Sequence, residues 1–274
     1  MREIALAAQT VLDVGPVGLV HAAAMAGCPF VGPRIKPVLA SDPRVIGTPL
    51  EDELVAALRT TGVQVMESGV FPITAEMNWS AIASGLRFSA RIGARFLGCP
   101  CDDPDHVRAA ENLAHVCELA QPHGLVVLVE FSPRRACGNL EQAFKIVSTA
   151  GKANSGLLID ALHLSRSGGQ PSDLASVDPH FLRLAHLCDA TPFDPDVRSF
   201  DRMRAEANQA RLYPGEGHLW LEEFVRALPH NTPLSIEAPS AKHAHRPAAE
   251  RAKLAIEATR KLLHRCGEVV GCVT

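Results

Sequence analysis

Long apolar runs, positive net charge and aromatic side chains are all scarce in this chain of 274 residues. No apolar run approaches the roughly 18 residues that a membrane-spanning helix needs, so we expect no membrane partner. The formal net charge is -3, and aromatic residues make up 5% of the chain. The chain therefore has little excess positive charge to attract phosphates and few aromatic side chains to stack on bases, and we expect no nucleic-acid partner.

Cysteine is too sparse for a protein held together by disulfides, because the chain has 8 cysteines and no C-x-x-C pair. Cys99 and Cys101 stand too isolated to predict a zinc site. Near the first residues, Glu3 and Asp13 interrupt what would otherwise resemble a short secretory signal. We expect reduced, mostly buried thiols and a cytoplasmic location.

Short apolar runs alternate with amphipathic segments along the chain. Eight strands are predicted, at Ile4–Ala8, Phe30–Arg34, Val63–Glu67, Ala94–Leu97, Val126–Phe131, Gly156–Asp160, Leu182–Leu187 and Pro233–Glu237. Several of these runs are apolar throughout, which is typical of parallel strands covered on both faces. Such repeated strand–helix units predict an α/β protein with the (β/α)8 TIM-barrel fold, as a single domain over residues 1–274. A doubly wound sheet is the alternative.

Three helices between or after these strands are predicted in detail, over residues 105–121, 140–150 and 247–266. In the first, Val107, Ala110, Ala114 and Cys117 are spaced to share a buried face. Gly151 is expected to end the second helix, since glycine favours that position. The least regular stretch, residues 191–217, is long enough to indicate a functional loop.

Polar residues lie at or next to the ends of four successive predicted strands. These residues are Glu130, Asp160, His186 and Glu237. In a TIM barrel the carboxyl ends of the strands meet at the face that carries the chemistry. A single carboxylate there is usually solvated or caps a helix, but four strands in succession supply an oxygen and nitrogen ligand set. That set suits Mn²⁺, Mg²⁺, Co²⁺ or Zn²⁺, since a bound cation would offset the cost of burying the carboxylates.

The segments LVVLVEF, LLIDALHLSRSGG, HLCDA, RLYPGEGHLWLEEFVRAL and LSIEAPS resemble the xylose-isomerase-like TIM-barrel family of sugar isomerases and epimerases. The D-x-x-H from Asp160 to His163 and the R-x-x-P-G-E-G from Arg211 to Gly217 are the most specific pieces. The resemblance implies one divalent metal ion held by the four strand-end residues. It also implies acid/base catalysis by Glu130 and Glu237, with His163 and Arg211 binding substrate oxygens.

The implied activity is isomerisation or epimerisation of a sugar, keto-sugar or related polyol through an enediolate intermediate. Loss of a β-hydroxyl from the same intermediate would instead make the protein a dehydratase or lyase on a keto-polyol or cyclic hydroxy acid. A phosphodiesterase acting on abasic DNA is disfavoured, because the early strands end near Arg34 and Glu67 without histidine. A non-catalytic sugar- or metal-binding protein on the same scaffold stays open. A homodimer or homotetramer is expected from what is common for such barrels.

Several further residues are assigned from their positions. Gln9, Arg34 and Glu67 are expected to face the pocket from early strands, and Glu216 to fix either its loop or Arg211. The segment 191–210 is longer than a simple epimerase needs, and we expect a lid, a short helix or an oligomer contact there. Its arginines, Arg198, Arg202 and Arg204, are candidates for meeting an anionic group.

Overall fold

The computed structural model describes residues 2–38, 42–193 and 199–268. Nine parallel strands form one sheet in the order β3-β2-β1-β9-β8-β7-β6-β5-β4. They are β1 (Ile4–Ala7), β2 (Phe30–Gly32), β3 (Gln64–Val65), β4 (Glu67–Ser68), β5 (Phe96–Pro100), β6 (Val126–Glu130), β7 (Ser155–Asp160), β8 (Leu182–Leu187) and β9 (Leu234–Ile236).

The sheet closes on itself through Met66, which separates β3 from β4. The Met66 amide donates to the carbonyl of Val31, and the Met66 carbonyl accepts from the amide of Phe96. This residue therefore joins β2 on one side to β5 on the other. The predicted eight-stranded TIM barrel is confirmed, with the expected strand Val63–Glu67 present as two short pieces.

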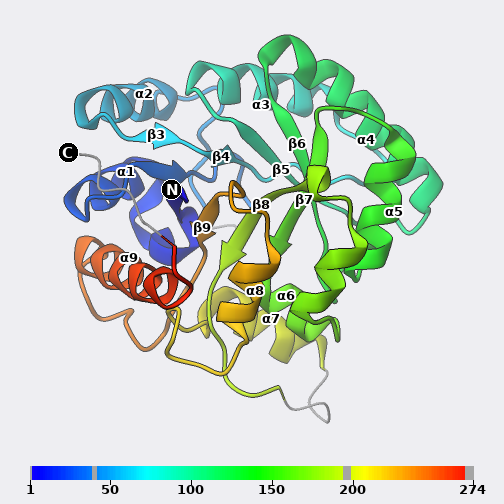
Figure 1. The fold of residues 1–274 in the computed structure, drawn as a ribbon. Coiled ribbons are helices and arrows are strands. Elements are labelled where there is room, and N and C mark those ends of the chain that lie inside the picture. Colours follow the sequence, from blue (N-terminus) through cyan, green and yellow to red (C-terminus); the bar gives the residue numbers. More distant parts are fainter. Residues whose placement is uncertain (1, 39–41, 194–198, 269–274) are drawn as a thin grey trace.

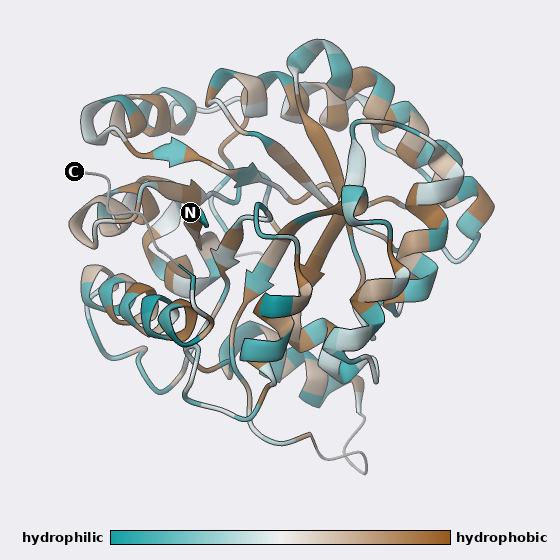
Figure 2. Ribbon diagram, viewed as in Figure 1, coloured by the Kyte–Doolittle hydropathy of each residue, from teal (hydrophilic) through white to brown (hydrophobic). Residues whose placement is uncertain are grey.

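Helices surround the strands on the outside of the barrel (Figure 1). They are α1 (Gly15–Met25), α2 (Leu50–Thr61), α3 (Trp79–Arg91), α4 (His106–Ala120), α5 (Leu140–Ala150), α6 (Ala161–Arg166), α7 (Phe200–Gln209), α8 (Leu221–Ala227) and α9 (Ala248–Arg265). Strands such as β6 and β7 are strongly apolar, whereas the outer helices carry both polar and apolar residues (Figure 2). The larger apolar core thus lies between the strands and the helices.

A second, smaller core fills the inside of the barrel. It consists of Ala5, Met66, Leu128, Leu158 and Leu184, with Phe30, Phe96 and Val126 packed against it. Neighbouring strand residues such as Leu157 and Ile159 belong to the outer core instead. Side chains therefore alternate between the two cores along each strand, as the pleat requires.

Local sequence sets the ends of the helices. The Asn139 side chain accepts from the amide of Gln142 at the start of α5, and Gly151 ends that helix in the left-handed conformation, as predicted. The predicted face of α4 is only partly right, because Val107 is 66% exposed. Leu113 and Val116 are fully buried and lie at the centre of the real face.

Part of the irregular stretch 191–210 is a short helix. That helix is α7, and Ala207 is its one buried residue among those described. Arg198 lies outside the described residues. No helix in the described part of the chain is both long and apolar enough to cross a membrane.

Candidate metal centre

The pleat of the barrel strands determines which polar side chains reach the candidate site. Leu128, Leu158 and Leu184 point into the barrel. The residue two positions further along each strand therefore points the same way. Those residues are Glu130 on β6, Asp160 on β7 and His186 on β8. Each of these three candidate ligands is thus the next inward residue after a core leucine.

The four residues predicted as ligands come together. One ligand atom from each of Glu130, Asp160, His186 and Glu237 lies within 4.8 Å of the others. Asp160 and His186 are direct partners in the register of β7 and β8. Glu237 follows β9, and its amide donates to the Leu187 carbonyl at the end of β8. Adjacent parallel strands therefore fix the spacing of the cluster.

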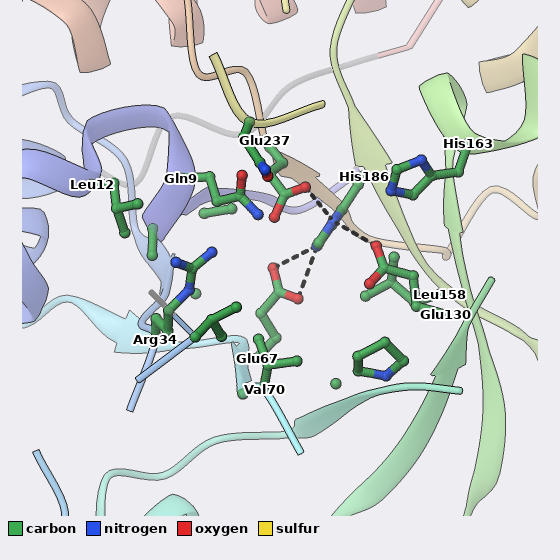
Figure 3. Close-up of a pocket in the computed structure, with 18 of the residues that line it drawn as sticks. Gln9, Leu12, Arg34, Glu67, Val70, Glu130, Leu158, His163, His186 and Glu237 are labelled. Atoms are coloured by element: carbon green, nitrogen blue, oxygen red, sulfur yellow. Dashed lines mark hydrogen bonds and ion pairs between the residues drawn. The ribbon is translucent and has the colours of Figure 1, made fainter. Parts of the chain in front are cut away.

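His186 stands in the middle of this cluster (Figure 3). Its Nε2 donates to the Glu67 carboxylate, at 3.0 and 2.9 Å from the two oxygens. Its Nδ1 lies 3.5 Å from Glu237 Oε2, 3.9 Å from Glu130 Oε1 and 4.0 Å from Asp160 Oδ2. This Nδ1 is buried and has no hydrogen-bond partner among the described residues.

Gly32 on β2 makes the room that Glu67 occupies. A Cβ at position 32 would lie 2.6 Å from Glu67 Cγ and 2.7 Å from its Oε1. Real Cβ atoms do not approach that closely, so any larger residue would displace the carboxylate that orients His186. Glu67 was expected to face the pocket, but its bond to His186 was not foreseen.

Arg211 is buried beneath the cluster, at 1% exposure. Its Nη1 lies 2.5 Å from Asp160 Oδ2 and its Nη2 lies 3.0 Å from Glu237 Oε2. Its Nε donates to the Ala207 carbonyl of α7. Arg211 therefore acts as a fixed counter-charge for two candidate ligands, and its predicted contact with substrate oxygens stays a prediction.

The PGEG turn after Arg211 is held against β8. Asp189 accepts from the amides of Gly215 and Leu219 at 2.9 Å each. Gly217 packs so tightly that a Cβ there would lie 2.3 Å from the Ala190 carbonyl oxygen. Glycine at this point of the motif thus has a packing reason, and the turn fixes the backbone that carries Arg211.

Glu216 holds the same turn but does not touch Arg211. Its carboxylate accepts from Lys242 Nζ at 2.7 Å and from His243 Nε2 at 3.1 Å. It also accepts from the Tyr213 amide. Of the two alternatives for Glu216, the structure supports the one in which it fixes its own loop.

The two glutamates have opposite electrostatic surroundings. Burial and the neighbouring negative charge of Glu237 raise the pKa of Glu130 to about 7. Burial also acts to raise the pKa of Glu237, but the positive charges of His186 and Arg211 outweigh it and hold that pKa well below its usual range. The pair is therefore asymmetric, since Arg211 bonds to only one of them.

His163 lies beside the cluster on the first turn of α6. The Asp160 side chain accepts from its amide at 2.9 Å, which caps the helix and fixes the D-x-x-H geometry. Burial lowers the pKa of the His163 imidazole to about 4, against the attraction of Asp160. The ring is therefore neutral, and it lines the cavity as its predicted role requires.

The donor set fits a divalent cation. The cluster contains four carboxylates and two cationic side chains, so it carries excess negative charge in a buried place. The carboxylates are Glu67, Glu130, Asp160 and Glu237, and the cationic side chains are His186 and Arg211. The carboxylates hold the pKa of His186 well above its usual range even though burial opposes this. A metal ion would replace the second imidazole proton at the unpartnered Nδ1.

The cluster opens into a cavity of about 380 Å³ at the carboxyl ends of the strands. That volume is within the range of small-molecule sites. Gln9, Arg34 and Glu67 line it, as expected from their strand ends. His163, Arg211, Glu130, His186 and Glu237 line it as well, whereas Asp160 is not among the lining residues.

Comparison with known proteins gives the family. The sequence of residues 20–262 matches the family described as xylose isomerase-like TIM barrel. The chain belongs to this family. Members with solved structures share the fold, as in the crystal structure of the IOLI protein with a bound zinc atom. That structure covers 97% of this chain with a TM-score of 0.80 and 17% sequence identity, and 99% of its own chain is matched.

Two of the curated relatives found by sequence comparison are named for an enzymatic activity. An inosose isomerase of Bacillus velezensis is 26% identical over 162 residues, which are 57% of this chain and 55% of that protein. A 3-dehydroshikimate dehydratase of Pseudomonas aeruginosa is 30% identical over 159 residues, which are 57% of this chain and 24% of that protein. The match thus spans about half of the isomerase and a quarter of the dehydratase.

Proposed function

We propose that this chain is a divalent-metal-dependent isomerase or epimerase that acts on a keto-polyol through an enediolate. The observation that carries the proposal is the convergence of the four ligand atoms within 4.8 Å. The unpartnered His186 Nδ1 inside that cluster supports it. The similarity to an inosose isomerase supports a cyclic keto-polyol as one substrate class.

Glu130, Asp160, His186 and Glu237 would hold the metal ion. When bound, the ion supplies positive charge next to the substrate's carbonyl and hydroxyl oxygens. Mn²⁺, Mg²⁺, Co²⁺ and Zn²⁺ all suit carboxylate and imidazole ligands, and none is favoured over the others by the donor set.

The proton transfers are assigned to the two glutamates. They stand on β6 and after β9, with β7 and β8 between them in the sheet. One glutamate removes the proton from the carbon next to the carbonyl, and the other returns a proton. Return to the opposite face of that carbon gives epimerisation, and return to the former carbonyl carbon gives isomerisation. Neutral His163 donates a hydrogen bond to a substrate oxygen that gains negative charge.

Dehydration is the second candidate. The similarity to a 3-dehydroshikimate dehydratase favours it. The same proton abstraction then leads to loss of the β-hydroxyl group instead of reprotonation. Products distinguish the two, because dehydration of a keto-polyol gives a conjugated enone that absorbs in the ultraviolet, whereas isomerisation and epimerisation do not.

Glu237→Gln tests the proposed function on metal-loaded protein, with an inosose and 3-dehydroshikimate as substrates. We expect turnover to fall by about 10²–10⁴-fold, the usual effect of losing a proton-transfer group. Glu222→Gln is the matched control, since Glu222 lies on α8, pairs with Arg226 and Arg265, and does not line the cavity. Metal content is measured on each variant. Full turnover by Glu237→Gln would show that the acid/base assignment is wrong.

A further inference from the structure

Five arginines are among the residues that line the cavity. They are Arg34, Arg134, Arg135, Arg204 and Arg211. Three of them have carboxylate partners. Arg34 pairs with Asp42 at 3.0 Å, Arg135 pairs with Asp102, and Arg211 is held by the cluster.

Arg134 and Arg204 differ from the other three. Within the described part of the chain, neither makes a hydrogen bond or an ion pair with a carboxylate. Arg134 is half-buried in the loop that follows β6, four residues beyond Glu130. Arg204 is exposed on α7. Two guanidinium groups thus border the cavity with no internal acceptor.

The position of Arg134 is electrostatically unfavourable without an anion. Its burial, together with the positive charges of Arg135 and Arg211, lowers the pKa of its guanidinium. Attraction by Glu130 and Asp160 offsets this only in part. A ligand that brings negative charge to this side of the cavity would relieve the repulsion.

Helix α7 turns one face toward the same space. Phe200, Arg204 and Asn208 all line the cavity and are spaced four residues apart, so they lie along one side of the helix. Arg204 is therefore held over the cavity by a regular element. The neighbouring Arg202 is exposed and does not line the cavity.

The cavity is thus lined by excess negative charge at the cluster and by the unpaired positive charges of Arg134 and Arg204. We propose that the substrate is a keto-polyol bearing an anionic group, whose keto-polyol end faces the metal cluster and whose anionic group pairs with Arg134 and Arg204. The inference rests on the proposed function and narrows its substrate class. The shared chemistry is that of a carboxylate or a phosphate, which guanidinium groups bind through paired hydrogen bonds.

Equilibrium binding tests this without requiring turnover. Three probes are titrated calorimetrically into metal-loaded wild type: shikimate, which carries a carboxylate; fructose 6-phosphate, which carries a phosphate; and myo-inositol, which is uncharged. We expect one of the anionic probes to bind at least tenfold more tightly than myo-inositol, and the tighter of the two identifies the anionic group. Equal or tighter binding of myo-inositol would overturn the inference.

Arg134→Gln and Arg204→Gln locate the anion site, and Arg202→Gln on the same helix is the matched control. Each of the first two should weaken binding of the preferred anionic probe by about tenfold or more, as expected for a hydrogen bond to a charged group. Binding of myo-inositol and metal content should not change. Unchanged anion binding in both variants would overturn the assignment to these arginines.

The proposed function can fail independently of this inference. Turnover of an inosose by wild type, with no preference for anionic probes, would keep the isomerase and remove the anionic substrate. A preference for anionic probes that depends on Arg134 and Arg204, in a protein that takes up no metal, would keep the anion site and remove the proposed chemistry.

Discussion

The two halves of the barrel contribute different things to the cavity. The half from β6 to β9 supplies charge, since all four candidate ligands come from its strand ends. The half from β1 to β5 supplies mostly space, through small residues such as Ala7, Gly32 and Gly98. Three charged residues of this half, Arg34, Glu67 and Asp102, also line the cavity, and Glu67 accepts a hydrogen bond from His186 of the other half.

The different side chains of the two halves explain how one closed sheet contains both the candidate ligand cluster and a cavity large enough for a small molecule. Bulky residues fill the lower barrel, where Met66, Leu128 and Leu184 pack together. One layer higher, the second half continues with Glu130 and His186, while the first half continues with small side chains. The chemistry is therefore asymmetric although the backbone is nearly regular.

We expect the largest effect, on the free energy of unfolding, from replacing Arg211, the counter-charge of the cluster in the β6–β9 half. Arg211→Met leaves the Asp160 and Glu237 carboxylates buried without their partner. We expect the free energy of unfolding to fall by about 3–5 kcal/mol, the usual result of breaking a buried ion pair from one side. Urea unfolding of metal-free protein measures it.

Arg166→Met is the control for that variant. Arg166 is also a buried arginine with a carboxylate partner, Glu206, but it does not line the cavity. It should lose stability while keeping wild-type metal affinity. A loss below about 1 kcal/mol in Arg211→Met would contradict the view that Arg211 balances the cluster.

A smaller effect is expected from breaking the contact between Glu67 and His186. Glu67→Ala removes the acceptor that orients His186, and changes of this kind typically cost 10–100-fold in metal affinity. Glu67→Gln keeps an oxygen acceptor and should lose less. Calorimetric titration with Mn²⁺ or Zn²⁺ measures both variants. An unchanged affinity in Glu67→Ala would mean that His186 needs no such support.

The smallest effect concerns the space that the first half provides. Gly32→Ala places a methyl group 2.6 Å from Glu67 Cγ, so the carboxylate must shift. We expect metal affinity to drop by roughly two- to tenfold, less than when the acceptor is lost. Gly98→Ala is the control, since its Cβ would meet only the Ser68 carbonyl oxygen at 3.8 Å. Equal affinities in the two variants would argue against the steric role of Gly32.

The charged half was the more predictable from sequence. Its strands are apolar runs that end in a polar residue, and the two-residue period of a strand places that residue above a core leucine. The polar residues at the strand ends, together with the family resemblance, predicted Glu130, Asp160 and His186 as one set, and the structure brings them together. The D-x-x-H motif also has a local cause, the cap that Asp160 forms on α6.

The position of Glu67 at the pocket was predicted, but its contact with His186 was harder to foresee. Val65 belongs to the outer core and Met66 to the inner one, so a regular strand would direct Glu67 outward. The strand is interrupted at Met66, and Glu67 reaches the cavity instead. A local break in pairing leaves no signal in the apolar pattern, and the partner His186 is 119 positions away.

The helix α4 was predicted correctly but its buried face was displaced. Ala110 and Cys117 are buried as expected, whereas Val107 is exposed. A chain of +3 and +4 steps fits several overlapping faces of a helix, and the packing of α4 between its neighbours selects among them. The spacing of apolar residues therefore predicted the position of the helix in the sequence more accurately than it predicted which face of the helix is buried.

Metal stoichiometry is the most direct test of the proposal that Glu130, Asp160, His186 and Glu237 hold one divalent metal ion. Wild type purified without chelator and then offered Mn²⁺, Co²⁺ or Zn²⁺ is compared by elemental analysis with Asp160→Ala and Glu130→Gln. The second variant keeps the Asp160–Arg211 pair, so it separates ligand loss from misfolding. We expect about one metal ion per wild-type chain, and we expect both variants to lose most of this bound metal. Wild type that takes up no metal, or variants that retain it fully, would contradict the four-ligand centre.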